Sequence, residues 1–224
     1  MTAPEPVTRV IELSGAHRRK HFDFFNSMEQ PHYSVCARME IDPLLRWRET
    51  TGTSSLTVTM VYLIADAANR VPQLRQRIRG REVVEHETVY PSFTVDTESS
   101  DVFSFCSVPF DRPFENFNRL AEQRIDLMRT HPSFEDEPGR DDFLIMSAIP
   151  WVSFTAITHA SHCPQTDSIP RITWGRHQRC CPASDVRKLP VSIQVHHALV
   201  DGRHVGEFFG ILQESLLEPG KILG

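Results

Sequence analysis

The segment from Leu189 to Gly202, LPVSIQVHHALVDG, constrains the fold of this 224-residue chain more than any other. Apolar and polar residues alternate along it, which is typical of a β-strand with one buried face. His197 continues the apolar face, whereas His196 is expected to point outward or toward polar groups. Burial disfavours the charged imidazolium, so a neutral imidazole would be available as a base near pH 7. The alternation therefore predicts a strand over 189–197 that ends in a histidine suited to general-base chemistry.

Asp201 lies four residues beyond His197, directly before a helix predicted from about Gly202 to Leu217. Both residues also have ordinary structural interpretations. Asp201 could cap the helix by accepting a backbone N–H, and His197 could be a hydrogen-bonded core histidine. On spacing alone the structural interpretations are the commoner ones, so the choice rests on the rest of the chain.

The remaining periodicity predicts helices mixed with many strands. Apolar residues at helical spacing predict helices over Arg18–Met28, from Ser54 or Ser55 to Val71, and over Phe114–Met128. Aromatic and β-branched runs predict strands at Tyr33–Ile41, Glu82–His86, Phe93–Asp96, Val102–Val108, Trp151–Thr158 and Ile169–Trp174. This mixture favours an α+β fold, a two-layer sandwich in which helices cover a large mixed β-sheet.

Length and composition indicate one globular domain over residues 1–224. No repeat or linker divides the chain, and the polar stretch from His131 to Asp142 is expected to be a surface loop. The 24 basic and 29 acidic residues give a net charge of −5, which argues against a nucleic-acid or anionic-membrane partner. We see no secretory signal and no apolar span of membrane length. The five cysteines, with Cys180 and Cys181 adjacent, favour a reduced, cytoplasmic protein.

The segment HHALVDG matches the HHxxxDG signature of CoA-dependent acyltransferases. The blocks RRKHFDFF, YPSFTV, VFSF, SAIPWVSFT and QVHHALVDGRHVGEFF also occur in the order found in chloramphenicol acetyltransferases. They extend from about Arg18 to Leu217, so the chain resembles this family over nearly its whole length. The resemblance implies a CoA-dependent acyltransferase-like fold and metal-free transfer of acetyl from acetyl-CoA to a hydroxyl of chloramphenicol or a similar acceptor, and thus antibiotic resistance.

The resemblance also implies roles for individual residues. His197 would be the general base in a direct transfer, and Asp201 would form a structural ion pair with Arg18 that shapes the site. Ser147 would donate to the oxyanion of the tetrahedral intermediate, and Thr173 would help to hold an ordered water nearby. The alternative for Ser147 is an ordinary turn serine.

Two groups of binding residues follow from the same resemblance. The CoA channel would be lined by Trp151 and His177, although Trp151 could instead be core and a tyrosine is commonest at the second position. The acceptor pocket would be lined by Phe24, Phe25, Thr94 and Phe103, although each Phe could simply pack in the core. In the family these pocket residues and the base come from neighbouring subunits, which implies a homotrimer with active sites at its interfaces.

The segment His159–Ser168, HASHCPQTDS, departs from the family pattern. It replaces a stretch rich in Phe, Leu and Asn that forms part of the chloramphenicol wall, and Met146 and Ser92 differ from the family as well. Loss of apolar wall weakens binding of a nitrophenyl group, because each buried methylene contributes about 0.8 kcal/mol. The same chemistry on another hydroxyl-bearing acceptor, such as a sugar-like compound, is therefore one alternative. A non-catalytic acyl-CoA-binding trimer is another.

The 11 histidines raise the question of a metal site. The residues with zinc-binding side chains are His159, His162, Cys163, His177, Cys180 and Cys181. Their spacing matches no structural zinc pattern, and the second group, His177, Cys180 and Cys181, falls in a predicted hairpin turn over Arg179–Asp185. We therefore predict no metal site.

Overall fold

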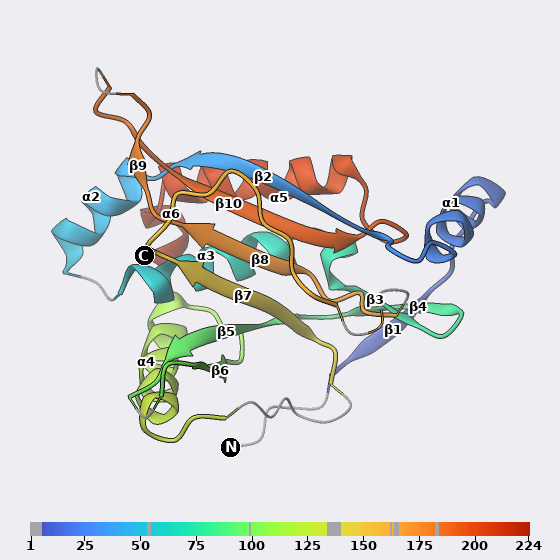
Figure 1. The fold of residues 1–224 in the computed structure, drawn as a ribbon, viewed down its shortest axis with the longest axis horizontal. Coiled ribbons are helices and arrows are strands. Elements are labelled where there is room, and N and C mark those ends of the chain that lie inside the picture. The colour runs from blue at the N-terminus through green and yellow to red at the C-terminus, as the bar shows by residue number, and fades with distance from the viewer. Residues whose placement is uncertain are drawn as a thin grey trace.

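The computed structural model describes residues 6–52, 55–98, 100–133, 140–161, 163, 166–181 and 184–224. Within these residues a large mixed sheet has the strand order β2-β10-β8-β7-β5-β6, with β9 paired to β10 (Figure 1). Its strands are β2 (His32–Glu40), β5 (Tyr90–Asp96), β6 (Phe103–Ser107), β7 (Phe143–Ile149), β8 (Arg171–Gly175), β9 (Gln178–Arg179) and β10 (Arg187–His196). The β5–β7 and β7–β8 pairs are parallel and the others antiparallel, so the predicted mixed sheet is confirmed.

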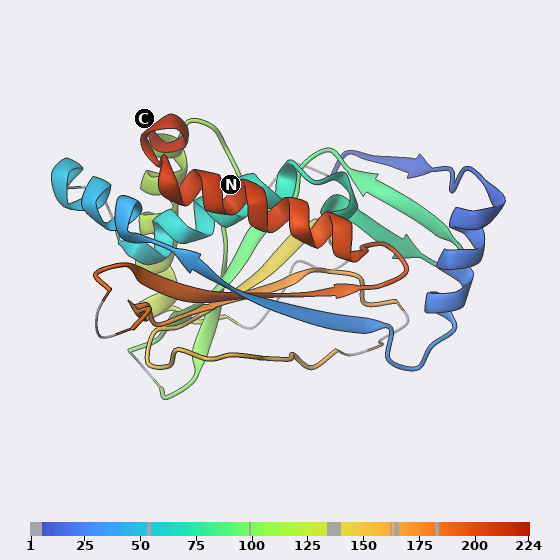
Figure 2. The same ribbon diagram turned by 90° about the horizontal axis from the view of Figure 1, so that it is seen from above.

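Helices cover one face of this sheet (Figure 2). They are α2 (Asp42–Thr51), α3 (Leu56–Asn69), α4 (Phe114–Thr130), α5 (Gly202–Leu217) and α6 (Gly220–Leu223). The alternating face of β10 meets them, because Leu189, Val191, Ile193 and Val195 are all almost fully buried in the hydrophobic core. The predicted α+β two-layer architecture is therefore confirmed.

The central helix α3 shows how local sequence sets the layer. The side chain of Ser55 accepts the Val58 N–H at 3.2 Å and caps the helix, while Pro72 lies just beyond its end. Residues 58–68 are buried all round the helix, as expected for a helix enclosed by the sheet and neighbouring helices.

A second, smaller sheet lies beside α1 (Ala16–Asn26) at one end of the molecule (Figure 1). Its order is β1-β4-β3, with β1 (Thr8–Ile11), β3 (Gln76–Arg79) and β4 (Glu82–His86), and a short 3₁₀ turn, η1 (Pro72–Arg75), leads into it. This end of the molecule brings α1 close to the end of β10, where the two adjacent histidines lie.

The opposite face of the large sheet is crossed by residues 150–161, which we call the strap (Figure 2). The strap lies directly on β8, because a Cβ on Gly175 would meet the Val152 carbonyl oxygen at 2.6 Å. The strand predicted over Trp151–Thr158 is wrong; the strand in this block is β7, which ends at Ile149. Pro150 has no N–H to continue a ladder, and the strap passes over the sheet rather than along an edge.

Other predicted elements are present with shifted ends, whereas some of the observed elements were not predicted. The helices near 18, 55, 114 and 202 and the strands near 33, 82, 93, 103, 171 and 189 are confirmed within a few residues. The elements α2, β1, β3, β7, β9 and α6 were missed.

The polar stretch from His131 to Asp142 is a surface loop only in part. Residues 134–139 lie outside the described residues. Asp142 is fully buried and accepts Arg140 Nη2 at 2.6 Å, so the loop prediction is wrong at this end. No helix in the described part of the chain is both long and apolar enough to cross a bilayer.

Candidate active site

His197 lies just beyond the end of β10, in a nest of aromatic rings. Its backbone N–H donates to the Pro31 carbonyl at 2.9 Å, and its imidazole stacks on Phe25 with centroids 3.8 Å apart and planes 12° apart. The Tyr33 ring lies 4.5 Å away. The side chain is half-buried, and Nδ1 is enclosed without a hydrogen-bond partner among the described residues. The packing therefore fixes the ring and leaves Nε2 as the nitrogen that can meet another molecule.

His196 differs from its prediction. It is only 1% exposed rather than pointing outward, although its surroundings are polar as expected. Its Nδ1 accepts the Ala198 N–H at 3.2 Å, and its ring lies edge-on to His32 at 5.2 Å. His196 shares a face of β10 with Gln194, and the strap, to which Gln194 is hydrogen-bonded, covers this face, so the polar face of the strand is not an exposed one.

Asp201 is the N-cap of α5. Its Oδ1 accepts the Gly202 N–H at 2.7 Å, while its own N–H donates to His204 Nδ1 at 3.0 Å, which completes a capping box. The structural interpretation of Asp201 is thus confirmed, because the side chain is exposed and its hydrogen bond goes to backbone.

Arg18 is held by other partners than the one predicted. Its Nη2 donates to the Leu199 carbonyl at 2.9 Å, and its Nη1 lies 3.0 Å from His21 Nδ1. No direct ion pair joins Arg18 to Asp201 among the described residues, so the predicted ion pair is wrong in this chain. Burial lowers the pKa of Arg18, and the nearby negative charge of Asp201 opposes that effect at longer range.

The negative charge of Asp201 affects the pKa values of several side chains around His197. The Gly202 hydrogen bond lowers the pKa of Asp201 despite some burial, and His197 and His21 lower it further. Burial raises the pKa of Tyr33 to about 12, and the negative charge of Asp201 adds to that effect. Burial and Arg18 lower the pKa of His21. Tyr33 therefore stays a neutral donor and Asp201 an anion at neutral pH.

A second group of polar side chains crosses the middle of the sheet. Thr94 Oγ1 lies 3.2 Å from Ser147 Oγ, and Ser147 is directly opposite Thr173 in the parallel β7–β8 pair. Thr173 is fully buried, lies opposite Ser192 of β10, and its Oγ1 is 3.0 Å from His159 Nε2. Ser147 is therefore in a strand beside two hydroxyls, and its interpretation as a turn serine is wrong.

The two groups are far apart within one chain. Five residues of β10 separate Ser192 from His197, which corresponds to about 17 Å at 3.3 Å per residue. His197 in one chain therefore does not reach Ser147 or Thr173.

The residues of the implied acceptor pocket divide between the same two groups. Phe25 stacks on His197, and Phe24 lies 5.1 Å from Phe25 and is 60% exposed. Thr94 contacts Ser147 on the sheet, and Phe103 is 41% exposed on the edge strand β6, against the Phe105 ring at 5.4 Å. The expectation that all four lie on a different subunit from the base is wrong for Phe25, because it packs on His197 of its own chain.

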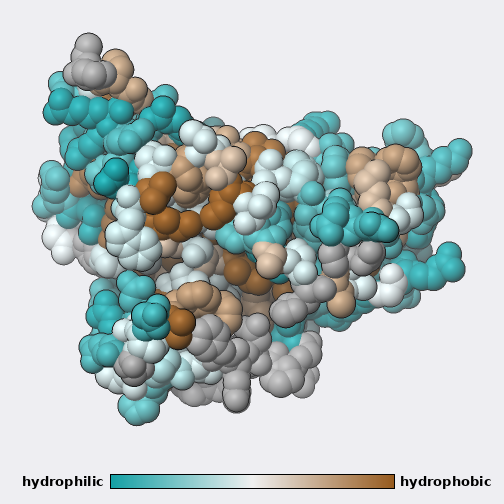
Figure 3. Space-filling model, viewed as in Figure 1, coloured by the Kyte–Doolittle hydropathy of each residue, from teal (hydrophilic) through white to brown (hydrophobic). Residues whose placement is uncertain are grey.

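The two residues of the implied CoA channel follow neighbouring parallel strands. Trp151 comes just after β7 and is 66% exposed, so it is not a core residue. His177 lies between β8 and β9, and burial, together with the positive charge of Arg187, lowers its pKa. Apolar side chains gather toward the middle of the sheet face that the strap crosses (Figure 3). Val152, which follows Trp151 in the chain, is exposed as well.

Three residues of these groups were not predicted as site residues. His21 lies three residues after Arg18 and four before Phe25, so helical spacing could have placed it on the same face of α1. Tyr33 begins a predicted strand, but nothing in the sequence indicates that it packs on His197. His159 approaches Thr173 only because the strap folds back over the sheet.

The candidate metal residues do not form a site in the described part of the chain. No group of three or more His, Cys, Asp or Glu side chains that could hold a metal ion is found there, and His162 lies outside it. His159 is instead bonded to Thr173.

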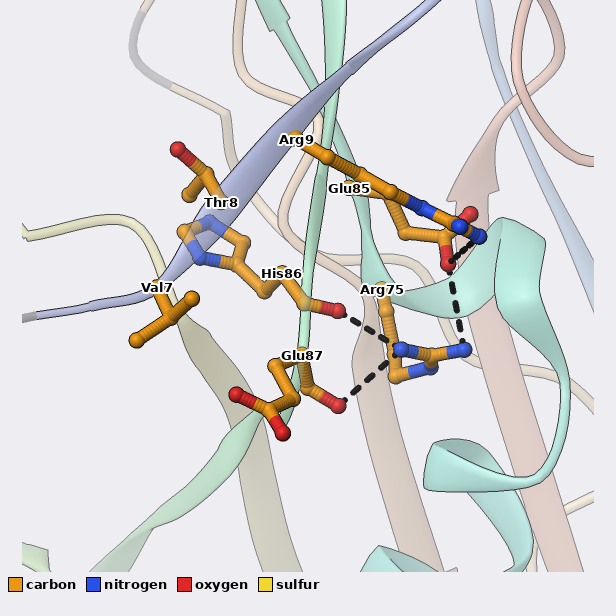
Figure 4. Close-up of a pocket in the computed structure, with 7 residues that line it drawn as sticks. All are labelled: Val7, Thr8, Arg9, Arg75, Glu85, His86 and Glu87. Carbon is orange, nitrogen blue, oxygen red and sulfur yellow. Dashed lines mark hydrogen bonds and ion pairs between the residues drawn. The ribbon is translucent and has the colours of Figure 1, made fainter.

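A separate cavity of about 380 Å³ lies at the small sheet and contains none of the predicted site residues (Figure 4). Arg9 and Arg75 both pair with Glu85, at 2.9 and 3.2 Å, and Arg75 also donates to the backbone carbonyls of His86 and Glu87. Both arginines of the cavity are therefore already bonded to groups of the protein.

Comparison with known proteins identifies a matching family. A family model described as chloramphenicol acetyltransferase matches residues 7–213. Chloramphenicol acetyltransferase 3 from Escherichia coli is 31% identical over 202 residues, 88% of this chain and 91% of the relative. A chloramphenicol acetyltransferase from Clostridium perfringens is 29% identical over 210 residues, 92% of this chain and 93% of the relative.

Solved structures share the fold. A chloramphenicol acetyltransferase structure superposes with a TM-score of 0.81 at 21% identity, covering 94% of this chain and all of the other. The cubic core of a pyruvate dehydrogenase multienzyme complex gives a TM-score of 0.67 at 18% identity, covering all of this chain and 95% of the other.

Proposed function

The chain belongs to the chloramphenicol acetyltransferase family, and from this premise we propose that it transfers the acetyl group of acetyl-CoA directly to a hydroxyl of chloramphenicol or a similar acceptor. Such an acyltransferase confers chloramphenicol resistance by acetylating the drug. One observation carries the mechanism: the His197 imidazole is fixed against Phe25 and Tyr33 with Nε2 left to meet an acceptor.

In the proposed reaction, His197 Nε2 removes the proton of the acceptor hydroxyl as that oxygen attacks the thioester carbonyl carbon. The carbonyl π electrons move onto oxygen and form a tetrahedral oxyanion. When this intermediate collapses, the C–S bond breaks, the acetyl ester remains on the acceptor, and the CoA sulfur takes the proton back from His197. A positioned base of this kind is typically worth about 10²–10⁴ in rate.

Ser147 would donate its hydroxyl hydrogen to the developing oxyanion. Thr94, at 3.2 Å, supports this role because it fixes the Ser147 hydroxyl from the neighbouring strand. Thr173, opposite Ser147, would hold an ordered water near the same oxygen. Trp151 and His177 would line the path of the CoA arm, with acetyl-CoA as co-substrate and no metal.

Arg18 and Asp201 would position rather than transfer protons. Arg18 ties α1, which carries Phe25, to the Leu199 carbonyl in the turn after His197. Asp201 caps α5 and fixes the other end of that turn. Together they would hold the His197 imidazole in place against the Phe25 ring on which it stacks.

We further propose a homotrimer in which His197 of one chain meets Ser147 and Thr173 of the next. The separation of about 17 Å along β10 supports this, because neither group is complete without the other. A head-to-tail interface of cyclic symmetry would create one complete site for each pair of neighbours. The five cysteines are free, which supports a reducing, cytoplasmic setting.

The test is acetyl-CoA turnover by the purified protein with chloramphenicol, measured as release of the CoA thiol. We expect acceptor-dependent release, and a loss of at least about 10³-fold in kcat for His197→Ala with its circular dichroism spectrum unchanged. His131→Ala, at an exposed histidine after α4, is the matched control and should retain the full rate.

A near-normal rate for His197→Ala would contradict the role of this residue as base. Binding of acetyl-CoA without thiol release for any hydroxyl acceptor would instead favour a non-catalytic acyl-CoA-binding trimer.

A further inference from the structure

A polar cavity of about 480 Å³ lies between the strap and the adjoining ends of β2 and β10, a size typical of small-molecule sites. Its described lining residues are Gln30, His32, Tyr33, Ser34, Thr158, His159, Ala160, Ser161 and Gln194. All of these except Ala160 carry a hydrogen-bonding side chain, and none is Asp, Glu, Lys or Arg. The lining is therefore rich in donors and acceptors but carries no permanent charge.

The side chain of Gln194 builds the wall of this cavity. Its Oε1 accepts the His159 N–H at 2.7 Å and its Nε2 donates to the His159 carbonyl at 3.1 Å, so the amide binds the strap as a neighbouring strand would. Ser34 Oγ donates to the same Oε1 at 3.2 Å. Since Gln194 is only 4% exposed and lies within β10, the strap is fixed to the rigid sheet.

Two histidines keep unused hydrogen-bonding positions in this lining. His32 Nε2 lies 2.7 Å from the Asp167 carbonyl and must donate to it, so in neutral His32 the Nδ1 is an acceptor, and it has no partner among the described residues. His159 uses Nε2 for Thr173, and its Nδ1 makes no hydrogen bond within the described part of the chain. Burial lowers the pKa of both histidines, so both are neutral at pH 7.

Arg171 and Asp167, which lie next to the lining residues Gln194 and His32, form an ion pair with each other. Arg171 Nη2 bonds Asp167 Oδ2 at 2.6 Å, and both side chains are nearly buried. The cavity therefore offers neutral hydrogen bonding and little attraction for a charged acceptor. An aromatic or aliphatic acceptor would leave these polar groups desolvated and unpaired, which is unfavourable.

Tyr33 connects the cavity to the chemistry, because it both lines the cavity and packs against the His197 ring. We propose that this cavity binds the body of the acceptor while His197 meets its reacting hydroxyl, and that the preferred acceptor is a neutral polyhydroxylated molecule of monosaccharide size. This inference rests on the proposed function and specifies its substrate class.

The test compares kcat/KM with saturating acetyl-CoA for chloramphenicol and for the methyl α-glycosides of glucose, galactose and mannose. We expect at least one methyl glycoside to have a higher kcat/KM than chloramphenicol. A higher kcat/KM for chloramphenicol than for all three glycosides would overturn the inference and leave the proposed function intact. Thiol release with none of the four would overturn the proposed function itself.

His159 provides the matched variants. His159→Leu should lower kcat/KM for the favoured glycoside relative to chloramphenicol about tenfold, the effect of losing one hydrogen bond to the acceptor. His159→Gln keeps a donor and an acceptor and should restore the ratio, whereas the exposed control His131→Leu should not change it. A merely structural role would reduce both substrates equally, so an unchanged ratio in His159→Leu would refute the assignment.

Discussion

Two inactive variants, His197→Ala and Ser147→Ala, should restore activity when their chains assemble together. Within one chain these residues are separated by about 17 Å along β10 and by two further strand spacings of about 4.8 Å across the sheet. The direct distance is therefore about 19 Å, compared with the roughly 3 Å that a shared reacting centre requires. If both side chains act on one substrate, as proposed, a neighbouring copy has to supply one of them.

The magnitude follows from the symmetry of the assembly. A ring of three copies has three interfaces, and in any mixed ring of the two variants one interface joins an intact His197 to an intact Ser147. Mixed trimers should therefore have about one third of the wild-type activity. The homotrimeric variants should retain only about 10⁻³ and 10⁻² of it, respectively.

The assay uses co-expression with two different affinity tags and purification over both, so that only mixed assemblies remain. Thiol release per subunit is then compared with wild-type protein carrying the same pair of tags. Mixed assemblies no more active than the better single variant would refute the shared site. A stable monomer in solution would refute it as well.

Three further predictions test the site and its support. Ser147→Ala alone should lower kcat about 10²–10³-fold with little change in KM for either substrate, because its donor acts on charge that develops in the transition state; a change confined to KM would contradict this role. Asp201→Ala should lower the free energy of unfolding by about 1 kcal/mol, as for loss of an N-cap, and Asp201→Ser should recover most of it; a loss of about 3–5 kcal/mol in denaturant unfolding would indicate a buried ion pair instead. Burial alone would raise the pKa of Asp141, but hydrogen bonds from His86 and Arg79 hold this pKa well below its usual range. The contribution of Asp141 to the free energy of unfolding is therefore complete above the pKa of the unfolded chain, about 3.9, and declines as the pH falls toward the lower pKa of the folded protein. Asp141→Asn should therefore be more destabilising at pH 7 than at pH 3 in thermal unfolding, and an equal loss at both would contradict this account.

Periodicity alone predicts most of the long elements, although the ten-residue helix α2 and the seven-residue strand β7 were missed. The stretch Leu189–Val195 buries its apolar face as expected, and the helix after Asp201 begins and ends where its cap and apolar spacing indicate. Elements such as β1 and β3 were missed because a four-residue strand has no measurable period and depends on a partner distant in sequence.

The errors at the site have separate physical causes. His196 is buried because the strap covers the polar face of β10, and no pattern in the sequence reveals that cover. The alternation also stops one residue before His197, because a turn follows His196. Arg18 donates to a backbone carbonyl, which carries no sequence signal, and its other terminal nitrogen lies beside His21. The aromatic and β-branched residues of the strap predict a strand, but they suit an extended segment lying on a sheet equally well. Only the fold decides between the two.

The attachment of the strap through the Gln194 amide has a consequence for how this protein can change over time. The exposed or half-buried side chains at 158–161 contribute nothing to the apolar core between sheet and helices. The strap is held there by the backbone atoms of His159 and by the hydrogen bond of the His159 side chain with Thr173. Substitutions at Thr158, Ala160 and Ser161 can therefore alter what the cavity accepts while the fold keeps its margin of stability. Changes in substrate range and changes in folding stability therefore arise at different residues of this fold. A small library of variants at these three positions is the natural starting point for directed evolution toward new acceptors.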